Sequence, residues 1–133
     1  MSDNIEVVKR SLDAMNRADF DAVAESSTED FELDFSNSLG PMSGIYRGRD
    51  GLKEFLRSFA EAWAALKFEF EEMIELEGDR VLLVAAVRAR GHESGVAVAA
   101  RGAMIWTVRD GEVAAVKMYQ SKEDALEGAS AKS

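Results

Sequence analysis

The spacing of apolar residues predicts helices in the first half of the chain. After Asp3, a good N-cap residue, apolar positions recur every three or four residues, at Ile5, Val8, Leu12 and Met15. A short second helix is expected from Asp19 to about Ser26. The longest helix is expected after Asp50, with a wide apolar stripe made by Leu52, Phe55, Leu56, Phe59, Trp63 and Leu66. Helices with such stripes can cover one face of a sheet.

Strands are predicted mainly in the second half. Phe31–Phe35 alternates apolar and polar residues, and so does Phe68–Glu77, apart from a slip near Met73 that suggests a β-bulge. Arg80–Arg90 is the next expected strand. Its segment 81–87 is apolar at every position, which is typical of a strand covered on both faces.

The strongest local signal is a β-hairpin within residues 96–120. Asp110-Gly111 lies between two apolar runs, and this dipeptide favours the tight turn of a hairpin. Ser121 is expected to cap a short helix, and residues 129–133 are expected to form a disordered tail. Residues 37–48 form the longest irregular stretch.

The order of these elements, helices early and strands late, indicates an α+β fold. We expect a cone-shaped α+β barrel whose strongly curved, mixed or antiparallel sheet carries the N-terminal helices on its concave face. One domain over residues 1–133 is expected from the length. The space between a bent sheet and its helices is the usual place for a ligand.

Composition and charge restrict the classes of function. A net charge of −9 argues against nucleic-acid and anionic-membrane partners. With no Cys and the single His92, neither a Cys-ligated nor a multi-His metal site is expected, and no Gly-rich phosphate loop is present, so we expect no cofactor. No apolar run approaches the roughly 18 residues of a spanning helix. The acidic start does not resemble a signal peptide, so a cytoplasmic location is expected.

Three motifs together resemble the SnoaL-like group, within the broad fold of nuclear transport factor 2 and ketosteroid isomerase. They are Asn16-Arg17-Ala18-Asp19-Phe20-Asp21, Gly44-Ile45-Tyr46-Arg47-Gly48-Arg49-Asp50-Gly51 and Ile105-Trp106-Thr107-Val108-Arg109-Asp110-Gly111. The resemblance runs from about Ile5 to Leu126. The fold hosts isomerases, polyketide cyclases, dehydratases and transport factors, so the resemblance implies a fold and a homodimer but no single activity.

The catalytic pattern of ketosteroid isomerase is missing. The resemblance places its tyrosine donor, its general-base aspartate and its protonated aspartate at Ser11, Phe35 and Met104. A dehydratase of the scytalone kind needs more than one histidine. The chain is therefore not expected to be a typical ketosteroid isomerase.

Three residues are candidates for acid–base chemistry, and each has a plainer interpretation. Asp34, near apolar side chains, could be a general base with a pKa raised by burial, or a solvated acid on the exposed face of its strand. His92 could transfer protons, or lie in a solvent-facing turn. Tyr46 could donate a hydrogen bond to a carbonyl oxygen, or pack its ring beneath the long loop.

The alignment with ketosteroid isomerase that the resemblance implies also predicts which side chains face the concave space. Val84, Ala86, Arg88 and Arg90 are expected to point inward, and the candidate ligand-binding residues are Met15, Phe59, Trp63, Arg88, Met104, Trp106, Met118 and Gln120. Arg88 would pair with a buried acid such as Asp34 or bind an anionic ligand. Its alternative is an arginine at a strand end that reaches solvent.

The opposite face of the sheet is expected to be apolar, through Val81, Leu83, Ala85, Val87, Val113, Ala115 and Tyr119. Because such a surface has to be covered, a homodimer through this outer face is predicted. The expected function is a pocket protein for a hydrophobic ligand bearing a carbonyl or carboxylate group. The alternative is a cofactor-free isomerase, polyketide cyclase or dehydratase that uses Asp34 or His92 as acid–base and Tyr46 or Arg88 as oxyanion donor.

Overall fold

The computed structural model describes residues 3–36, 44–91 and 97–131, with the side chains at positions 3, 59, 62–66, 68, 91, 97–100, 130 and 131 left out. Its helices are α1 Asp3–Asn16, α2 Phe20–Glu25, α3 Gly48–Ala62 and α4 Lys122–Ala131. Its strands are β1 Ser27–Asp34, β2 Ile45–Arg47, β3 Trp63–Leu76, β4 Arg80–Gly91, β5 Ala97–Arg109 and β6 Glu112–Tyr119.

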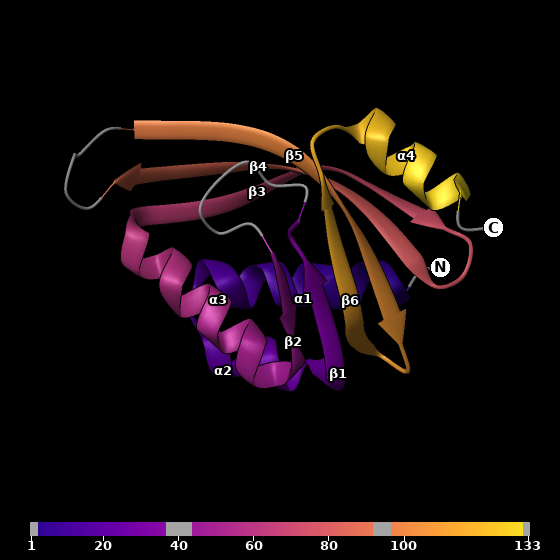
Figure 1. Ribbon diagram of the computed structural model, residues 1–133, viewed down its shortest axis with the longest axis horizontal. Coiled ribbons are helices and arrows are strands. Elements are labelled where there is room, and N and C mark those ends of the chain that lie inside the picture. The colour runs from indigo at the N-terminus through magenta and orange to yellow at the C-terminus, as the bar shows by residue number, and fades with distance from the viewer. Residues whose placement is uncertain (1–2, 37–43, 92–96, 132–133) are drawn as a thin grey trace.

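The six strands form one open, mixed sheet in the order β2-β1-β6-β5-β4-β3. β1 runs parallel to β6, and the other neighbours are antiparallel. Figure 1 shows that the sheet is strongly bent, with α1, α2 and α3 on its concave side and α4 on the opposite side. We call these sides the inner and the outer face. The predicted cone-like α+β fold is confirmed.

Capping and turn residues explain where several elements begin. The Asp19 side chain accepts a hydrogen bond at 3.2 Å from a backbone N–H of α2, and Ser121 Oγ accepts one at 3.1 Å in the first turn of α4. Asp110 and Gly111 have φ angles of 52° and 80°, the left-handed conformations that a two-residue hairpin turn needs. Both caps and the hairpin follow the sequence prediction.

The longest helix ends before its predicted apolar stripe does. α3 finishes at Ala62, and Trp63 pairs with Gly91 as the first residue of β3. The alanines in segment 62–66 favour a helix locally. Pairing with β4 satisfies the backbone of this segment in the sheet instead, so tertiary context overrides the local preference.

Three other segments contain more regular structure than predicted. β1 begins at Ser27, with a register shift before Glu32, and β2 lies inside the stretch 37–48 that was expected to be irregular. α4 continues to Ala131, and Ala129, expected in a disordered tail, is buried. Its contact with the outer face of the sheet explains this order, because that contact removes apolar surface from water.

The predicted faces of β4 are wrong by one residue. Leu83 pairs with Met104 and Val81 with Trp106, and these side chains belong to or pack against the large core cluster on the inner face. The outer face of β4 therefore carries the residues expected to point inward: Val84, Ala86, Arg88 and Arg90. Because segment 81–87 is apolar at every position, it has no alternation of apolar and polar residues that could show which side chains face inward.

α4 covers the apolar part of the outer face. A second core cluster there consists of Leu82, Ala103, Ile105, Tyr119, Ala125 and Ala129. The homodimer prediction depended on an apolar outer face made by other residues. Of these, Val81, Leu83, Ala85 and Val113 lie in the inner core, and Tyr119 lies beneath α4.

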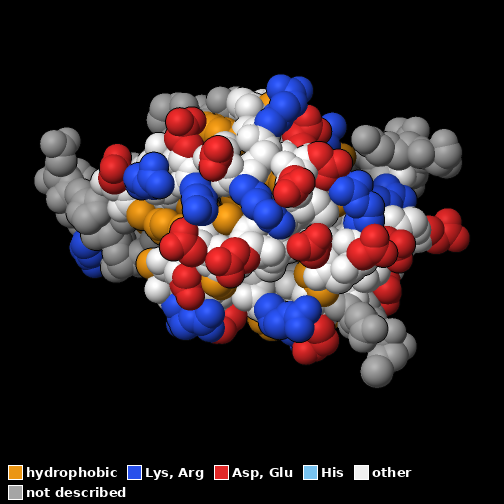
Figure 2. Space-filling view, turned by 90° about the horizontal axis from the view of Figure 1, so that it is seen from below, with side chains coloured by type: hydrophobic (Ala, Val, Ile, Leu, Met, Phe, Trp, Pro, Cys, Tyr) orange, Lys and Arg blue, Asp and Glu red, His pale blue; other side chains and the backbone are white. Residues whose placement is uncertain are grey.

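The surface seen from below in Figure 1 is strongly polar. Figure 2 shows acidic and basic side chains interspersed over it, with small apolar areas between them. Within the described ranges, no helix is long and apolar enough to cross a membrane.

Candidate functional site

Trp106 lies at the centre of the inner face. It is paired with Val81 of β4 on one side and with Val116 of β6 on the other, and it is only 3% exposed. Its Nε1 is buried and has no hydrogen-bond partner in the described part of the chain. A buried indole N–H normally finds an acceptor, so this unpaired donor is unusual.

Half-buried apolar side chains extend the inner face beyond this core. Met104 and Met118 are paired across β5 and β6, and Met15 of α1 packs against the same core. Inward-facing side chains that stay half-buried must border accessible space. Methionine is flexible and polarizable, which suits a surface that adapts to a bound molecule.

Aromatic rings continue this surface toward β2. The ring centroid of Phe55 lies 5.0 Å from that of Phe35 and 4.9 Å from that of Tyr46, both in edge-on geometry. Tyr46 pairs with Leu33, so it shares the inner face with the core. The candidate phenol donor is therefore on the side of the sheet where a ligand was expected.

Asp34, the expected general base, points the other way. It is the last residue of β1 and pairs with Lys117, which lies opposite Ile105 of the outer cluster. Its Oδ1 accepts hydrogen bonds from Ser36 N at 3.0 Å and Ser36 Oγ at 2.5 Å, and its Oδ2 lies 3.9 Å from Lys117 Nζ. The side chain is 20% exposed, so Asp34 is a tethered acid on the outer face.

Arg88 is also on the outer face, and its predicted inward position is wrong. Its side chain is 69% exposed, and Nε lies 3.0 Å from Glu69 Oε1. The one-residue error in the predicted faces of β4 moves Arg88 from the inner to the outer face. The predicted meeting of Arg88 and Asp34 inside the concave space therefore does not occur. The plainer interpretation, an arginine that reaches solvent, describes Arg88.

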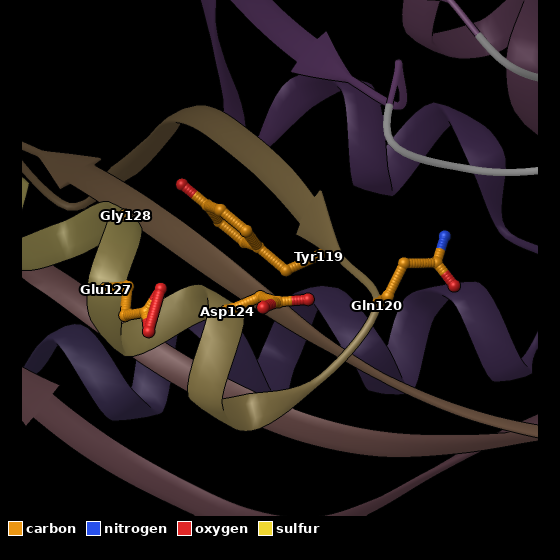
Figure 3. Close-up of a pocket in the computed structure, with 5 residues that line it drawn as sticks. All are labelled: Tyr119, Gln120, Asp124, Glu127 and Gly128. Carbon is orange, nitrogen blue, oxygen red and sulfur yellow. The ribbon is translucent and has the colours of Figure 1, made fainter.

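The other candidates are placed as follows. Gln120 follows β6, is exposed, and borders an outer-face groove beside α4. Figure 3 shows its side chain directed away from Asp124 and Glu127, so its inward position stays a prediction. Phe59 lies in α3 and Trp63 at the start of β3, but both side chains are outside the described set. His92 lies outside the described residues.

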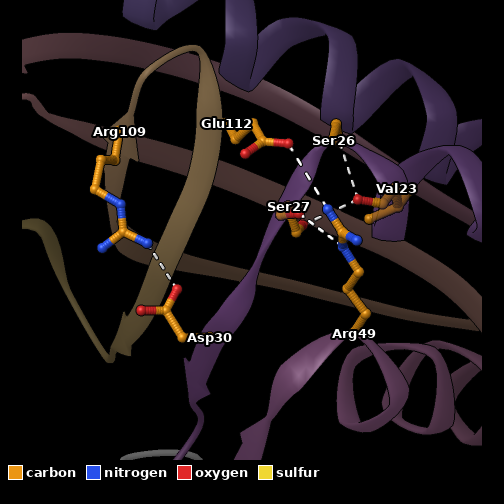
Figure 4. Close-up of polar contacts among 7 residues, drawn as sticks. All are labelled: Val23, Ser26, Ser27, Asp30, Arg49, Arg109 and Glu112. Atoms are coloured by element: carbon orange, nitrogen blue, oxygen red, sulfur yellow. Dashed lines mark hydrogen bonds and ion pairs between the residues drawn. The ribbon is translucent and has the colours of Figure 1, made fainter.

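Sequence reasoning missed a polar cluster at the end of the sheet where the β5–β6 hairpin meets the start of β1 (Figure 4). Arg49 Nε donates to the Ser27 carbonyl oxygen at 3.0 Å, and Arg49 Nη2 lies 3.7 Å from Glu112 Oε2. Arg109 donates to Asp30 Oδ1 at 2.7 Å. These contacts join α3, β1 and the hairpin, and two of the three motifs that carried the family resemblance supply the arginines.

This cluster also affects the titration of Asp30. The Thr28 hydroxyl and the Arg109 guanidinium beside it hold the pKa of the Asp30 carboxyl below its ordinary value of 3.8. The Asp30 side chain is 70% exposed, so the cluster serves the fold and is not a candidate acid–base site.

The comparisons with known proteins agree with this geometry. The family model of the SnoaL-like domain matches residues 8–116. A search of curated protein sequences found no match.

Several solved structures share the fold. TerC, co-crystallised with polyporic acid, has 23% identity and a TM-score of 0.79, with 95% of this chain and 97% of that chain covered. RV0760c from Mycobacterium tuberculosis, in complex with estradiol-17β-hemisuccinate, has 15% identity and a TM-score of 0.78, with 92% and 97% covered. The epoxide hydrolase/cyclase-like enzyme SalBIII has 18% identity and a TM-score of 0.76, with 91% and 92% covered.

These identities establish a shared architecture, and the match of the family model covers most of the chain. The protein therefore belongs to the SnoaL-like domain family.

Proposed function

We propose that this protein binds a hydrophobic small molecule on the inner face of its sheet, through a carbonyl or carboxylate oxygen that accepts a hydrogen bond from Trp106 Nε1. The unpaired indole N–H is the observation that carries this proposal. A buried donor without an acceptor costs about 1–3 kcal/mol, and a ligand oxygen would remove that cost. The surrounding apolar side chains suit the remainder of such a molecule.

Access to this donor requires a local side-chain movement, because Nε1 is enclosed. Met104 and Met118 form the next inward pair along β5 and β6, and both are half-buried. Methionine has three rotatable bonds and repacks at low cost. A change of rotamer at either position would open a path from the accessible part of the inner face to the indole.

The similar solved structures support the ligand class. TerC was co-crystallised with polyporic acid, and RV0760c is in complex with estradiol-17β-hemisuccinate.

The direct test is calorimetric titration with estradiol-17β-hemisuccinate as the probe. Trp106→Phe keeps an aromatic ring and removes the donor, so its affinity should fall about five-fold, because one net hydrogen bond contributes about 1 kcal/mol. Ile105→Val changes a buried neighbour on the outer face and should leave the affinity unchanged. Absence of binding to the wild type, or equal binding by Trp106→Phe, would contradict the proposal.

A second candidate function is a cofactor-free isomerase, cyclase or dehydratase. The inward position of Tyr46 favours it, because a phenol there can hydrogen-bond a developing oxyanion. The likeness to the cyclase-like SalBIII is consistent with it. His92 is the proton-transfer residue in this version, since Asp34 faces the opposite side.

Deuterium exchange from solvent into a bound ketone separates the two functions. A binding protein gives no exchange above the buffer rate. An acid–base site gives exchange that Tyr46→Phe and His92→Gln reduce while ligand affinity is retained.

We also propose a homodimer, through the part of the outer face that α4 does not cover. Ion pairs of β3–β5, Glu69 with Arg88 and Glu71 with Arg101, lie in this region. Charged side chains of both signs on one face can be self-complementary about a two-fold axis. Light scattering should then give twice the chain mass of 14.6 kDa, and the monomer mass would exclude the dimer.

A further inference from the structure

A groove lies on the outer face, between α4 and the end of β6 (Figure 3). Its volume is about 390 Å³, which is within the range of small-ligand sites. It is lined by Tyr119, Gln120, Asp124, Glu127 and Gly128. The sheet separates this groove from the inner face, so nothing in the proposed function above involves it.

Tyr119 supplies a buried wall of the groove and a hydroxyl group that has no hydrogen-bond partner among the described residues. The residue is 8% exposed and packs in the outer core cluster with Ala125 and Ala129. Its hydroxyl forms no hydrogen bond with any residue of the described ranges. The ring lies directly on α4, because a Cβ at Gly128 would be 2.5 Å from the hydroxyl oxygen. Packing therefore fixes the position of the hydroxyl, whose oxygen is not fully enclosed and stays accessible from the groove.

Two carboxylates on α4 face the same groove. Asp124 and Glu127 are three residues apart, which places them on one side of the helix. Neither carboxylate has an ion pair or a hydrogen bond within the described part of the chain. The nearby lysines are already engaged, since Lys122 Nζ lies 2.5 Å from Glu72 Oε1 and Lys117 Nζ lies 3.9 Å from Asp34 Oδ2. Among the described residues, no cation forms an ion pair with either carboxylate; Arg80 Nη1 reaches α4 but donates to the Ala129 carbonyl oxygen at 3.4 Å.

We propose that this groove binds a small primary amine with a second polar group. An ammonium has three N–H donors and no acceptor, so it matches two carboxylates that have only acceptor oxygens. The Tyr119 hydroxyl lies toward Gly128, away from Asp124 (Figure 3), where it can contact the second polar group of the same molecule. A bare metal ion fits less well, because no group of three acidic or histidine ligands gathers in the described chain.

The test is a titration of ¹⁵N-labelled protein with 1,4-diaminobutane at constant ionic strength, followed by amide chemical shifts. The shifts should saturate with a Kd of about 10 mM, as expected for two exposed ion pairs and one weak hydrogen bond acting together, and should concentrate in residues 119–128. The neutral analogue 1,4-butanediol should give no saturable shift. Tyr119→Phe removes only the hydroxyl and should weaken diamine binding about three-fold, by about half the value of an ordinary hydrogen bond.

Matched charge variants separate a site from a general ion atmosphere. Asp124→Asn with Glu127→Gln should weaken binding at least about ten-fold, by loss of both carboxylate contacts. Asp110→Asn with Glu123→Gln removes the same net charge from exposed positions outside the groove and should leave the Kd within about two-fold.

Equal weakening by the two double variants would overturn the proposal, as would shifts spread over all acidic surfaces. An unchanged Kd in a folded Tyr119→Phe variant would overturn the assignment of the hydroxyl. Failure of the inner-face proposal would not affect any of these results, because the groove lies on the other side of the sheet.

Discussion

Gly128→Ala tests the packing of α4 against the sheet most directly. A Cβ at this position would lie 2.5 Å from Tyr119 Oη, 2.7 Å from Cε2 and 2.8 Å from Cζ. Such distances are below van der Waals contact, so either the ring or the helix must move. Tyr119 is buried beneath α4, which leaves its ring little freedom to tilt.

Two opposing effects determine the size of the change. Overpacking of a well-packed site costs about 1–3 kcal/mol. Replacing glycine by alanine within a helix contributes about 1 kcal/mol in the opposite direction. We therefore expect Gly128→Ala to reduce the free energy of unfolding by about 1 kcal/mol, which corresponds to a fall in Tm of about 3–5 °C for a domain of this size.

The assay is urea unfolding in a double-mutant cycle with Tyr119→Leu. Leucine removes the ring atoms that the new methyl group would meet, so Gly128→Ala should be neutral or stabilising in that background. Stabilisation by Gly128→Ala in the wild-type background would refute the reasoning. So would an identical cost in both backgrounds, since the clash with Tyr119 would then not be its cause.

Two further predictions follow from the register and from the polar cluster. Leu83→Ala should cost about 2–5 kcal/mol of unfolding free energy because Leu83 is fully buried. Arg88→Ala should cost at most about 1 kcal/mol, because its ion pair is exposed; the reverse order in urea unfolding would contradict the observed faces of β4. Arg109→Gln should lower stability at neutral pH, by a difference that disappears in acid. Folding lowers the pKa of Asp30 below 3.8, so its ion pair contributes above that pH and is lost as the pH falls through the lower folded-state value. A difference between Arg109→Gln and wild type that persists after Asp30 is protonated would contradict this assignment.

Sequence reasoning gave the correct direction for three side chains of the hairpin but the wrong direction for those of β4. Met104, Trp106 and Met118 face inward as predicted. Val113, predicted on the outer face, lies in the inner core, because a register shift near the hairpin turn interrupts the alternation. Arg88 lies in a strand that is apolar on both faces, and its pattern allowed either direction. The unpaired N–H of Trp106 had no signal in the sequence, because it depends on which acceptors the other elements bring near.

Structural features that depend on residues close together in the chain could be predicted from the sequence itself. The stripe of α1, the cap at Asp19 and the positive φ angles at Asp110 and Gly111 each follow from neighbours a few residues away. Together they were sufficient to indicate helices on one face of a curved sheet.

Only the tertiary structure decided the direction of Asp34, the early end of α3 and the covering of the outer face by α4. Each of these depends on a strand or helix that is distant in sequence: Lys117 beside Asp34, Gly91 beside Trp63, and Tyr119 beneath Gly128. Apolar periodicity reports that a residue is buried, but the element that buries it is chosen by the packing of the whole chain.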